Sequence, residues 1–171
     1  LKFGGTSVGS IERIKKVCKI IINFTKKKYK VIVVSSAMSG ITNDLIKKSK
    51  LISKKFSQSE YDVLVSSGEQ MACSLIAGRL CDLGFNSKSM MGWQVPILTE
   101  GKYNSSRIVG THKKTINSML RTGVIPIVAG FQGINTENRI TTLGRGGSDA
   151  TAIMLAKFFK AKKCIIFTDV E

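Results

Sequence analysis

Residues 141–152 read TTLGRGGSDATA, and this glycine-rich stretch decides the fold that the sequence predicts. The residues before it, 139–142, are typical of a short strand, and residues 152–156 are a good opening for a helix. A helix N-terminus presents unpaired backbone N–H groups and the positive end of the helix dipole. Because phosphates and other anions bind at such ends, we predict an anion site at this turn.

A simpler interpretation makes Ser148 or Asp149 the N-cap of an ordinary helix. That interpretation explains one polar residue, but it leaves the three glycines around Arg145 without a reason. Glycine allows a positive φ and lets the backbone approach a ligand closely. The anion site therefore explains more of the stretch.

The same order of strand, turn and helix recurs along the chain. Continuous apolar runs predict strands, and apolar residues at helical spacing predict helices. Strands are expected at residues 1–3, 30–35, 87–91, 124–129 and 164–167, and helices at 11–22, from 41, at 60–83 and at 113–121. This alternation predicts an α/β fold with a mostly parallel sheet sandwiched by helices on both faces.

Local signals refine this picture. Ser10 is a plausible N-cap, and Gly84 and Gly123 are signals for helix ends. Gly68, in the middle of a predicted helix, suggests the close approach of another group. We expect residues 92–96 to form a loop and the polar residues 99–106 to form a surface loop.

Four segments rich in glycine or small polar residues follow or end predicted strands: residues 4–10, 36–40 and 130–133, and the stretch 141–152. The carboxyl ends of parallel strands meet at one edge of a sheet, and ligands bind beyond that edge. We therefore expect the four segments to converge on one site.

The chain carries a net charge of +16, from 27 basic and 11 acidic residues among 171. Such a charge leaves a basic nucleic-acid-binding module as an alternative. However, most of the basic residues are lysines in short groups on separate elements, and no aromatic residues are interleaved with them to stack on bases. Solvated, lysine-rich helix faces are the better interpretation, so we expect no nucleic-acid partner.

The four cysteines and the single histidine give no metal signal, so we assign no metal-ligating residue. Cys18, Cys73, Cys81 and Cys164 lack C-x-x-C spacing, and we expect buried, reduced thiols in a cytoplasmic protein. His112 is expected to start a helix. No apolar run is long enough to span a bilayer, so we expect no membrane partner.

The turn at residues 4–10 does not match the common phosphate-binding motifs. A P-loop has a lysine after its glycines, and a dinucleotide site has G-x-G-x-x-G. Here Lys2 precedes the glycines, at the tip of the first strand. A cation on a rigid strand beside backbone donors is what phosphoryl transfer requires.

Several motifs together resemble the aspartate kinases of the amino-acid kinase family, in order and in spacing. They are KFGGTSV at residues 2–8, SAMSGITN at 36–43, SGEQ at 67–70, AGFQG at 129–133, ITTLGRGGSD at 140–149 and TDV at 168–170. The resemblance covers nearly the whole chain. Acetylglutamate, glutamate 5-, uridylate and carbamate kinases are alternatives within the fold, but we expect them to lack Glu69 and Arg145 in these contexts.

The resemblance implies phosphorylation of the L-aspartate side-chain carboxylate by ATP, with Mg²⁺, to give 4-phospho-L-aspartate. This reaction is the first step toward lysine, threonine, methionine and diaminopimelate. It also implies a homo-oligomer at full length and a single kinase domain, truncated at both ends, over residues 1–171. The rest of the nucleotide-binding half and the C-terminal ACT regulatory domains are expected beyond this chain.

The resemblance also implies roles for individual residues. Lys2 and Asp149 are the expected catalytic pair. Lys2 is expected to stabilise charge on the γ-phosphoryl group. Asp149 is expected to orient Lys2 and the phosphates, or to assist Mg²⁺. Arg145 is expected to grip the α-carboxylate of aspartate and Glu69 its α-amino group. The remaining substrate residues are Ser36, Ala37, Thr42, Phe131, Gly146 and Ser148. The ATP and phosphate site is expected at Lys2, Gly4, Gly5, Ser7, Gly147, Thr168 and Asp169. Ala150 departs from the family, where Thr is usual.

Overall fold

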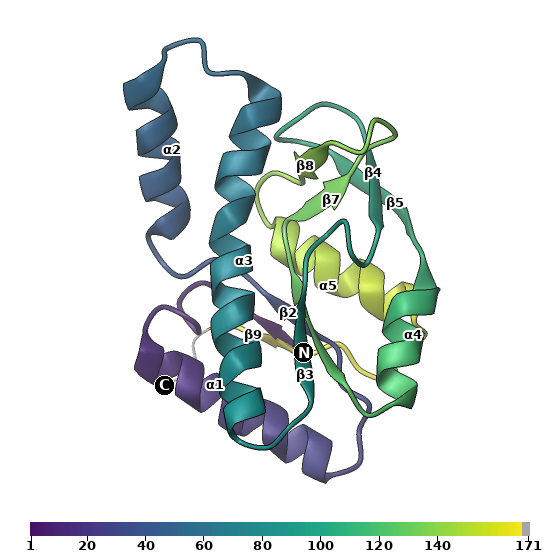
Figure 1. Cartoon of the computed structure of the whole chain (residues 1–171). Coiled ribbons are helices and arrows are strands. Elements are labelled where there is room, and N and C mark those ends of the chain that lie inside the picture. Colours follow the sequence, from purple (N-terminus) through teal and green to yellow (C-terminus); the bar gives the residue numbers. More distant parts are fainter. Residues whose placement is uncertain (169–171) are drawn as a thin grey trace.

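A computed structural model describes residues 1–168 of the chain. Its centre is a five-stranded sheet in which every neighbouring pair of strands is parallel (Figure 1). The strands follow the order β3 (Ser87–Met90), β6 (Ile125–Ala129), β2 (Val33–Ser35), β1 (Lys2–Phe3) and β9 (Ile166–Phe167). The parallel sheet that the sequence predicts is confirmed, although β2 and β9 are shorter than expected.

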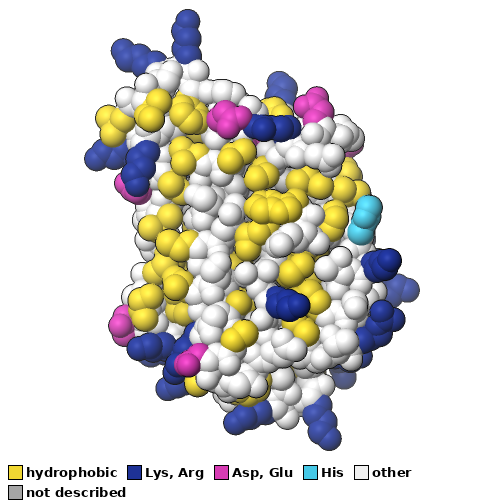
Figure 2. All heavy atoms as spheres, viewed as in Figure 1, with side chains coloured by type: hydrophobic (Ala, Val, Ile, Leu, Met, Phe, Trp, Pro, Cys, Tyr) yellow, Lys and Arg dark blue, Asp and Glu magenta, His cyan; other side chains and the backbone are white. Residues whose placement is uncertain are grey.

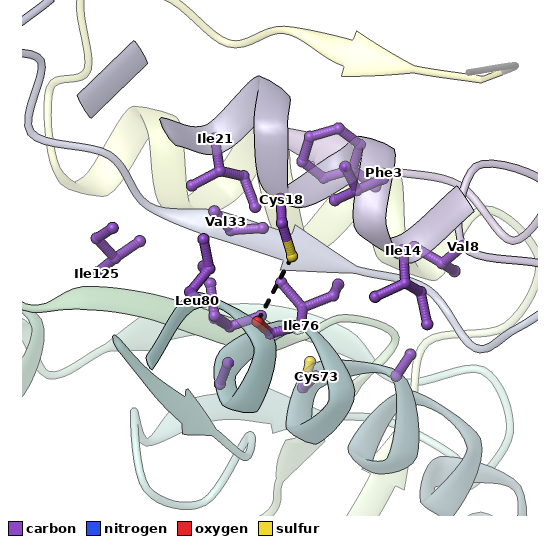
Figure 3. Packing of buried hydrophobic residues seen from close by; sticks show 14 of the residues in the cluster. Phe3, Val8, Ile14, Cys18, Ile21, Val33, Cys73, Ile76, Leu80 and Ile125 are labelled. Atoms are coloured by element: carbon purple, nitrogen blue, oxygen red, sulfur yellow. Dashed lines mark hydrogen bonds between the residues drawn. The ribbon is translucent and has the colours of Figure 1, made fainter. Parts of the chain in front are cut away.

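Helices cover both faces of this sheet, as predicted. Successive residues of a strand point to opposite faces, so Val33 joins one hydrophobic core and Val34 joins the other. The first core lies against α1 (Ile11–Lys26) and α3 (Gln58–Asp82), and Figure 3 shows residues from both helices meeting there. The second core lies against α4 (Lys113–Arg121) and α5 (Gly147–Phe158).

A smaller mixed sheet stands beside the main one and corrects one prediction (Figure 1). It contains β5 (Arg107–Thr111), β4 (Ile97–Glu100), β7 (Gln132–Ile134) and β8 (Ile140–Thr142). Residues 99–106 were expected to be a surface loop, yet residues 99 and 100 belong to β4 and only residues 101–106 connect it to β5. Polarity misled the prediction, because Thr99 is buried and its hydroxyl bonds that of Thr141, 2.5 Å away.

The helix ends follow their signals in most places. The Ser10 side chain caps α1 by accepting a hydrogen bond from the Arg13 N–H, and Gly84 takes a φ of 82° after α3. α5 is different: its N-cap is Gly146, with a φ of 74° and no side-chain cap. The interpretation of Ser148 or Asp149 as the N-cap is therefore wrong, because both residues lie within the first turn.

Gly68 of α3 does meet a close neighbour, as its position in the helix suggested. α2 (Ile41–Ile52) packs against α3, and the loop before it brings Ala37 onto Gly68. A Cβ at Gly68 would lie 2.8 Å from the Ala37 Cβ. By contrast, a Cβ at Gly78 of the same helix would meet nothing within 4 Å.

This contrast makes a matched pair of substitutions. Gly68→Ala should destabilise the protein by about 1–3 kcal/mol through overpacking. Gly78→Ala should stabilise it by up to about 1 kcal/mol through helix propensity. Urea denaturation of the two variants measures both free energies. A shift of the same sign in both variants would contradict the close packing of Ala37 on α3.

The cysteines only partly follow expectation. Cys18 and Cys73 are buried in the first core, and burial raises the pKa of the Cys18 thiol to about 11. Cys81 and Cys164 are exposed, which corrects the expectation of buried thiols. Cys81 lies near the C-terminal end of α3, and Cys164 precedes β9. Within residues 1–168, no helix combines the length and apolar character that crossing a bilayer requires.

Candidate functional site

The glycine-rich turns converge at the carboxyl edge of the main sheet, as predicted. β2, β6 and β3 lie on one side of β1, and β9 lies on the other. The direction of the strand order thus changes at β1, and such a switch point opens a crevice beyond the strand ends. Lys2 lies in β1 at this point, and α5 begins nearby and packs on β1.

The structure brings Lys2 and Asp149 together. The Lys2 Nζ atom lies 2.6 Å from the Asp149 Oδ1 atom, although the two residues are 147 positions apart in the sequence. The Lys2 side chain is buried, whereas about half of the Asp149 side chain is exposed. The ion pair holds the Lys2 side chain at the edge of the crevice, where Lys2 and Asp149 both line the cavity described below.

Arg145 extends from the turn between β8 and α5. Gly144 and Gly146, on either side of it, have φ values of 76° and 74°, which glycine adopts without a steric cost. Arg145 is exposed and makes no ion pair with another described residue. Its guanidinium is therefore free to bind an anionic ligand in the crevice.

The first turn of α5 packs closely against the residues that follow β6. A Cβ on Gly130 would lie 2.8 Å from the Ser148 Cβ, and a Cβ on Gly147 would lie 2.7 Å from the Phe131 Cδ2. Phe131 itself has a φ of 68°, a strained value for a residue with a side chain. Its N–H donates to the Thr151 hydroxyl, which holds this strained turn against α5.

Glu69 lies on α3. Its side chain is buried, and the Ala37 N–H donates to its Oε1 atom at 3.1 Å. Its Oε2 atom is buried with no hydrogen-bond partner among the described residues. Burial raises the pKa of Glu69 to about 7, since water no longer solvates the charged form. An unsatisfied carboxylate oxygen of this kind can accept from a cationic ligand.

These groups line one cavity of about 420 Å³. It brings together nine of the predicted residues: Lys2, Ser36, Thr42, Glu69, Phe131, Arg145, Gly146, Ser148 and Asp149. Ala37 lies behind Glu69 and contributes its N–H to it. The cavity is large enough for a small polar molecule, and its lining contains two cationic side chains, Lys2 and Arg145, and two carboxylates, Glu69 and Asp149.

Of the predicted phosphate residues that the structure describes, Lys2 lines this cavity, whereas Gly4, Gly5, Ser7, Gly147 and Thr168 do not. A Cβ on Gly4 would lie 3.4 Å from the Lys2 Nζ, so the turn is close to the cation. The Gly4 N–H donates to the Phe167 carbonyl, so this backbone donor is already used between β1 and β9. The Ser7 hydroxyl also donates to Phe167, and Gly5 packs on Ala37.

Thr168 follows β9 and accepts a hydrogen bond from the Thr6 hydroxyl through its carbonyl, which ties the end of β9 to the turn after β1. Asp169, predicted with Thr168 as part of the nucleotide edge, lies outside the described residues.

Sequence reasoning missed several residues of the site. Asn43, Tyr61 and Asn104 also line the cavity, and Asp62 accepts hydrogen bonds from two segments beside it. One signal was present for Asp62: it lies seven residues before Glu69, and this spacing puts both carboxylates on one face of a helix. Asn104 carried no such signal, because it lies in a polar loop.

Metal-ligating clusters are absent from the described part of the chain, and the face drawn in Figure 2 has no single basic patch. No group of three or more His, Cys, Asp or Glu residues could hold a metal ion within residues 1–168. Most of the lysines and arginines on the face in Figure 2 lie around its outline, and a few lie singly within the face. This distribution agrees with solvated helix faces.

The family model described as the amino acid kinase family matches residues 1–171. The chain is 47% identical over 173 residues to an aspartokinase of Rickettsia bellii and covers 99% of itself and 43% of that protein. It therefore spans less than half the length of this curated relative.

Solved structures of aspartate kinases also match the chain. The chain matches the aspartate kinase from Synechocystis with a TM-score of 0.83 and 41% identity, over 99% of this chain and 28% of that one. It matches E. coli aspartokinase III, solved with aspartate and ADP, with a TM-score of 0.84 and 24% identity, over 99% of this chain and 48% of that one. At 24% identity the second match shows the fold alone.

Proposed function

Because this chain belongs to the amino acid kinase family, we propose that it carries the aspartate-binding part of an aspartate kinase. The reaction is transfer of the γ-phosphoryl group of ATP to the side-chain carboxylate of L-aspartate. A carboxylate oxygen attacks the γ-phosphorus, the bond to the bridging oxygen breaks, and ADP leaves. The observation that carries the proposal is the pairing of Lys2 with Asp149 in a cavity that Glu69 and Arg145 also line.

This arrangement suits the chemistry because the enzyme needs no nucleophile of its own. The substrate supplies the attacking oxygen, so catalysis consists of positioning and neutralisation of charge. Lys2 stabilises the charge on the transferring phosphoryl group. Asp149 holds the ammonium group of Lys2 in place, at 2.6 Å.

The two ends of aspartate have complementary partners in the cavity. Arg145 offers two parallel N–H groups that match the α-carboxylate. The unpartnered oxygen of Glu69 accepts from the α-ammonium group, and this contact also relieves the cost of burying the carboxylate. Ser36, Thr42, Phe131, Gly146 and Ser148 complete the walls around the substrate.

We propose ATP as the phosphoryl donor and Mg²⁺ as its companion ion. The E. coli relative was solved with ADP, which supports a nucleotide substrate in this family. Mg²⁺ in kinases is held by one or two carboxylates together with phosphate oxygens. Asp149 fits this role, because its partly exposed carboxylate borders the cavity beside Lys2. Bound Mg²⁺ would supply further neutralisation of phosphate charge.

The domain assignment is also a proposal. Residues 1–171 form the first part of one kinase domain, and the remaining nucleotide-binding residues and regulatory domains belong to the part of the relatives that this chain does not match. Gly5, Ser7, Gly147, Thr168 and Asp169 begin the nucleotide side of the cleft. We propose that the full-length protein is a cytoplasmic homo-oligomer that starts the route to lysine, threonine, methionine and diaminopimelate.

A hydroxamate assay tests the proposed function. Acyl phosphates react with hydroxylamine, so the full-length protein with ATP should give hydroxamate from aspartate and little from glutamate or acetylglutamate. ADP release with uridylate, measured in parallel, tests the uridylate kinase alternative. Faster turnover of any of these than of aspartate would refute the proposal.

Glu69→Gln should separate stability from function. In the folded state the pKa of Glu69 is about 7, well above its ordinary value of 4.5. The unfolded chain therefore loses this proton first, so ionisation destabilises the fold as the pH rises from about 4.5 to about 7, and the penalty is constant above that. Glutamine avoids the penalty and can still accept from the Ala37 N–H. The variant should be more stable than wild type at pH 8 by about 2–3 kcal/mol, and by less at pH 5.

Glu69→Gln should lower the activity toward aspartate although it raises the stability. Without the carboxylate, the KM for aspartate should rise by about 10–100-fold. In the wild type, kcat/KM for aspartate should rise with pH through about 7, as Glu69 ionises. Urea denaturation at both pH values and steady-state kinetics measure these effects, with Glu137→Gln on the surface as the control. A variant that is less stable than wild type at pH 8, or an unchanged KM, would contradict the assignment of Glu69.

A further inference from the structure

Asp62 is a buried carboxylate on α3 that the reaction described above does not use. Its side chain is fully buried, and no lysine or arginine pairs with it in the described part of the chain. Burial raises its pKa, and hydrogen bonds from Asn104 and Thr142 oppose the rise. Because a buried acid with only neutral partners costs stability, its presence calls for another explanation.

The hydrogen bonds of Asp62 join two segments that are distant in the sequence. The Asn104 N–H lies 3.0 Å from each carboxylate oxygen. Thr142 donates its N–H at 2.8 Å and its hydroxyl at 2.9 Å. The two segments also bond each other, since the Ser106 N–H donates to the Thr142 carbonyl at 3.0 Å. Asp62 therefore fixes the end of β8 and the loop before β5 to α3.

These segments support the turn that carries Arg145. Thr142 is the last residue of β8, three positions before Arg145. The Asn104 carbonyl oxygen lies 3.2 Å from where a Cβ on Gly144 would be, so the loop packs directly beneath the turn. The route from Asp62 to Arg145 therefore runs through one short, closely packed stretch of backbone.

The face of α3 that carries Asp62 also contacts the segment around Phe131 and carries Glu69. One helical turn beyond Asp62, the Ser66 carbonyl accepts from the Gln132 side chain at 2.9 Å, next to Phe131. Glu69 follows on the same face, about 10 Å along the helix from Asp62. α3 thus sets the spacing between the Arg145 turn, the Phe131 turn and Glu69.

We propose that Asp62 is a positioning residue that fixes Arg145 relative to Glu69, and so directs the side-chain carboxylate of the substrate toward Lys2. This inference rests on the proposed function, because it assigns Arg145 and Glu69 to the two groups on the α-carbon of aspartate. When Arg145 binds the α-carboxylate and Glu69 binds the α-ammonium group, only the side-chain carboxylate of the substrate reaches the phosphoryl group. If the turn moved, the α-carboxylate would lose its partner first.

A double-mutant cycle in the full-length protein tests the proposal. Asp62→Asn keeps the shape of the side chain but loses one acceptor oxygen. It should raise the KM for aspartate by about tenfold or more and change the KM for ATP by less than about twofold. In an Arg145→Ala background the same change should have little further effect on the KM for aspartate, because Asp62 acts through Arg145. An unchanged KM, or an equal rise in both backgrounds, would overturn the proposal.

Thr142 provides a second, milder pair of variants in case Asp62→Asn does not fold. Thr142→Val removes the hydroxyl that donates to Asp62 and should raise the KM for aspartate. Thr142→Ser restores the donor and should recover most of the loss. If Thr142→Ser is as impaired as Thr142→Val, the hydroxyl contact does not position Arg145 and the proposal fails.

Hydrogen exchange separates this proposal from the proposed function. In Asp62→Asn or Thr142→Val, the amides of residues 142–147 should exchange faster, with unchanged exchange in α1. This result does not depend on which substrate the enzyme uses. If aspartate is not phosphorylated but exchange at 142–147 rises, the proposed function fails and the positioning role stands. Unchanged exchange there would refute the positioning role itself.

Discussion

Replacing Lys2 by methionine is expected to lower kcat for aspartate phosphorylation by about 10²–10³-fold, the cost of losing one charge-stabilising donor in a preorganised site. Methionine keeps most of the length of the side chain in the buried strand, so the loss is one of charge. The KM for aspartate should change little, because Lys2 acts on the transferring phosphoryl group. Steady-state kinetics of the full-length protein give both values.

Lys88→Met is the matched control, since Lys88 is an exposed lysine on the edge strand β3 of the same sheet. It should leave kcat unchanged. Asp149→Asn should also lower kcat, because it removes the partner that holds the Lys2 ammonium group 2.6 Å away. Activity of Lys2→Met within about threefold of wild type would remove Lys2 from the mechanism.

Replacing Arg145 by alanine is expected to raise the KM for aspartate by about 100-fold, since it removes a bidentate pair of charged hydrogen bonds. Arg145→Lys should be intermediate, because it keeps the charge but loses the planar fork. The KM for ATP should stay nearly constant in both variants. Arg121→Ala, at the exposed end of α4, is the control and should behave as wild type.

The outcome of these variants also identifies the group that Arg145 binds. An analogue of aspartate without the α-carboxylate should lose affinity for the wild type, yet bind Arg145→Ala and wild type equally. If Arg145→Ala instead raises the KM for ATP and leaves that for aspartate unchanged, the arginine serves the nucleotide and its assignment is wrong.

The main sheet could be predicted because its signals are local. Continuous apolar runs such as 124–129 are typical of strands buried on both faces, and glycines after strands mark the turns of a parallel sheet. The order of those turns then predicted that Lys2 and Asp149 share one edge, and the structure brings them into contact. That prediction needed only the fold class and the rule that carboxyl ends of parallel strands meet.

The smaller sheet could not be predicted in the same way. Its strands are short and partly polar, so the sequence favours a loop at β4, and the pairing that joins its two hairpins, Leu98 with Ile134, is remote in the sequence. Tertiary contacts decide its structure: buried Thr99 bonds Thr141, and a Cβ at Gly133 would lie 2.5 Å from the Ile97 carbonyl oxygen of β4, so only glycine fits there. The role of Asn104 was hidden for the same reason.

The site was predicted best where a residue has chemistry that its surroundings do not explain. Arg145 between glycines and Glu69 beside Gly68 are such residues, and both line the cavity. Gly4 shows the limit of this reasoning. A glycine-rich turn does not reveal which of its N–H groups are already used, and the Gly4 N–H completes the pairing of β1 with β9.

A structure of the full-length protein with aspartate and a non-hydrolysable ATP analogue tests the central claim most directly. The account predicts that the Lys2 Nζ lies about 3 Å from an oxygen of the γ-phosphate. It also predicts that the side-chain carboxylate of aspartate faces that phosphate, while Arg145 and Glu69 hold the two groups on its α-carbon. Aspartate bound elsewhere, or a γ-phosphate remote from Lys2, would contradict it.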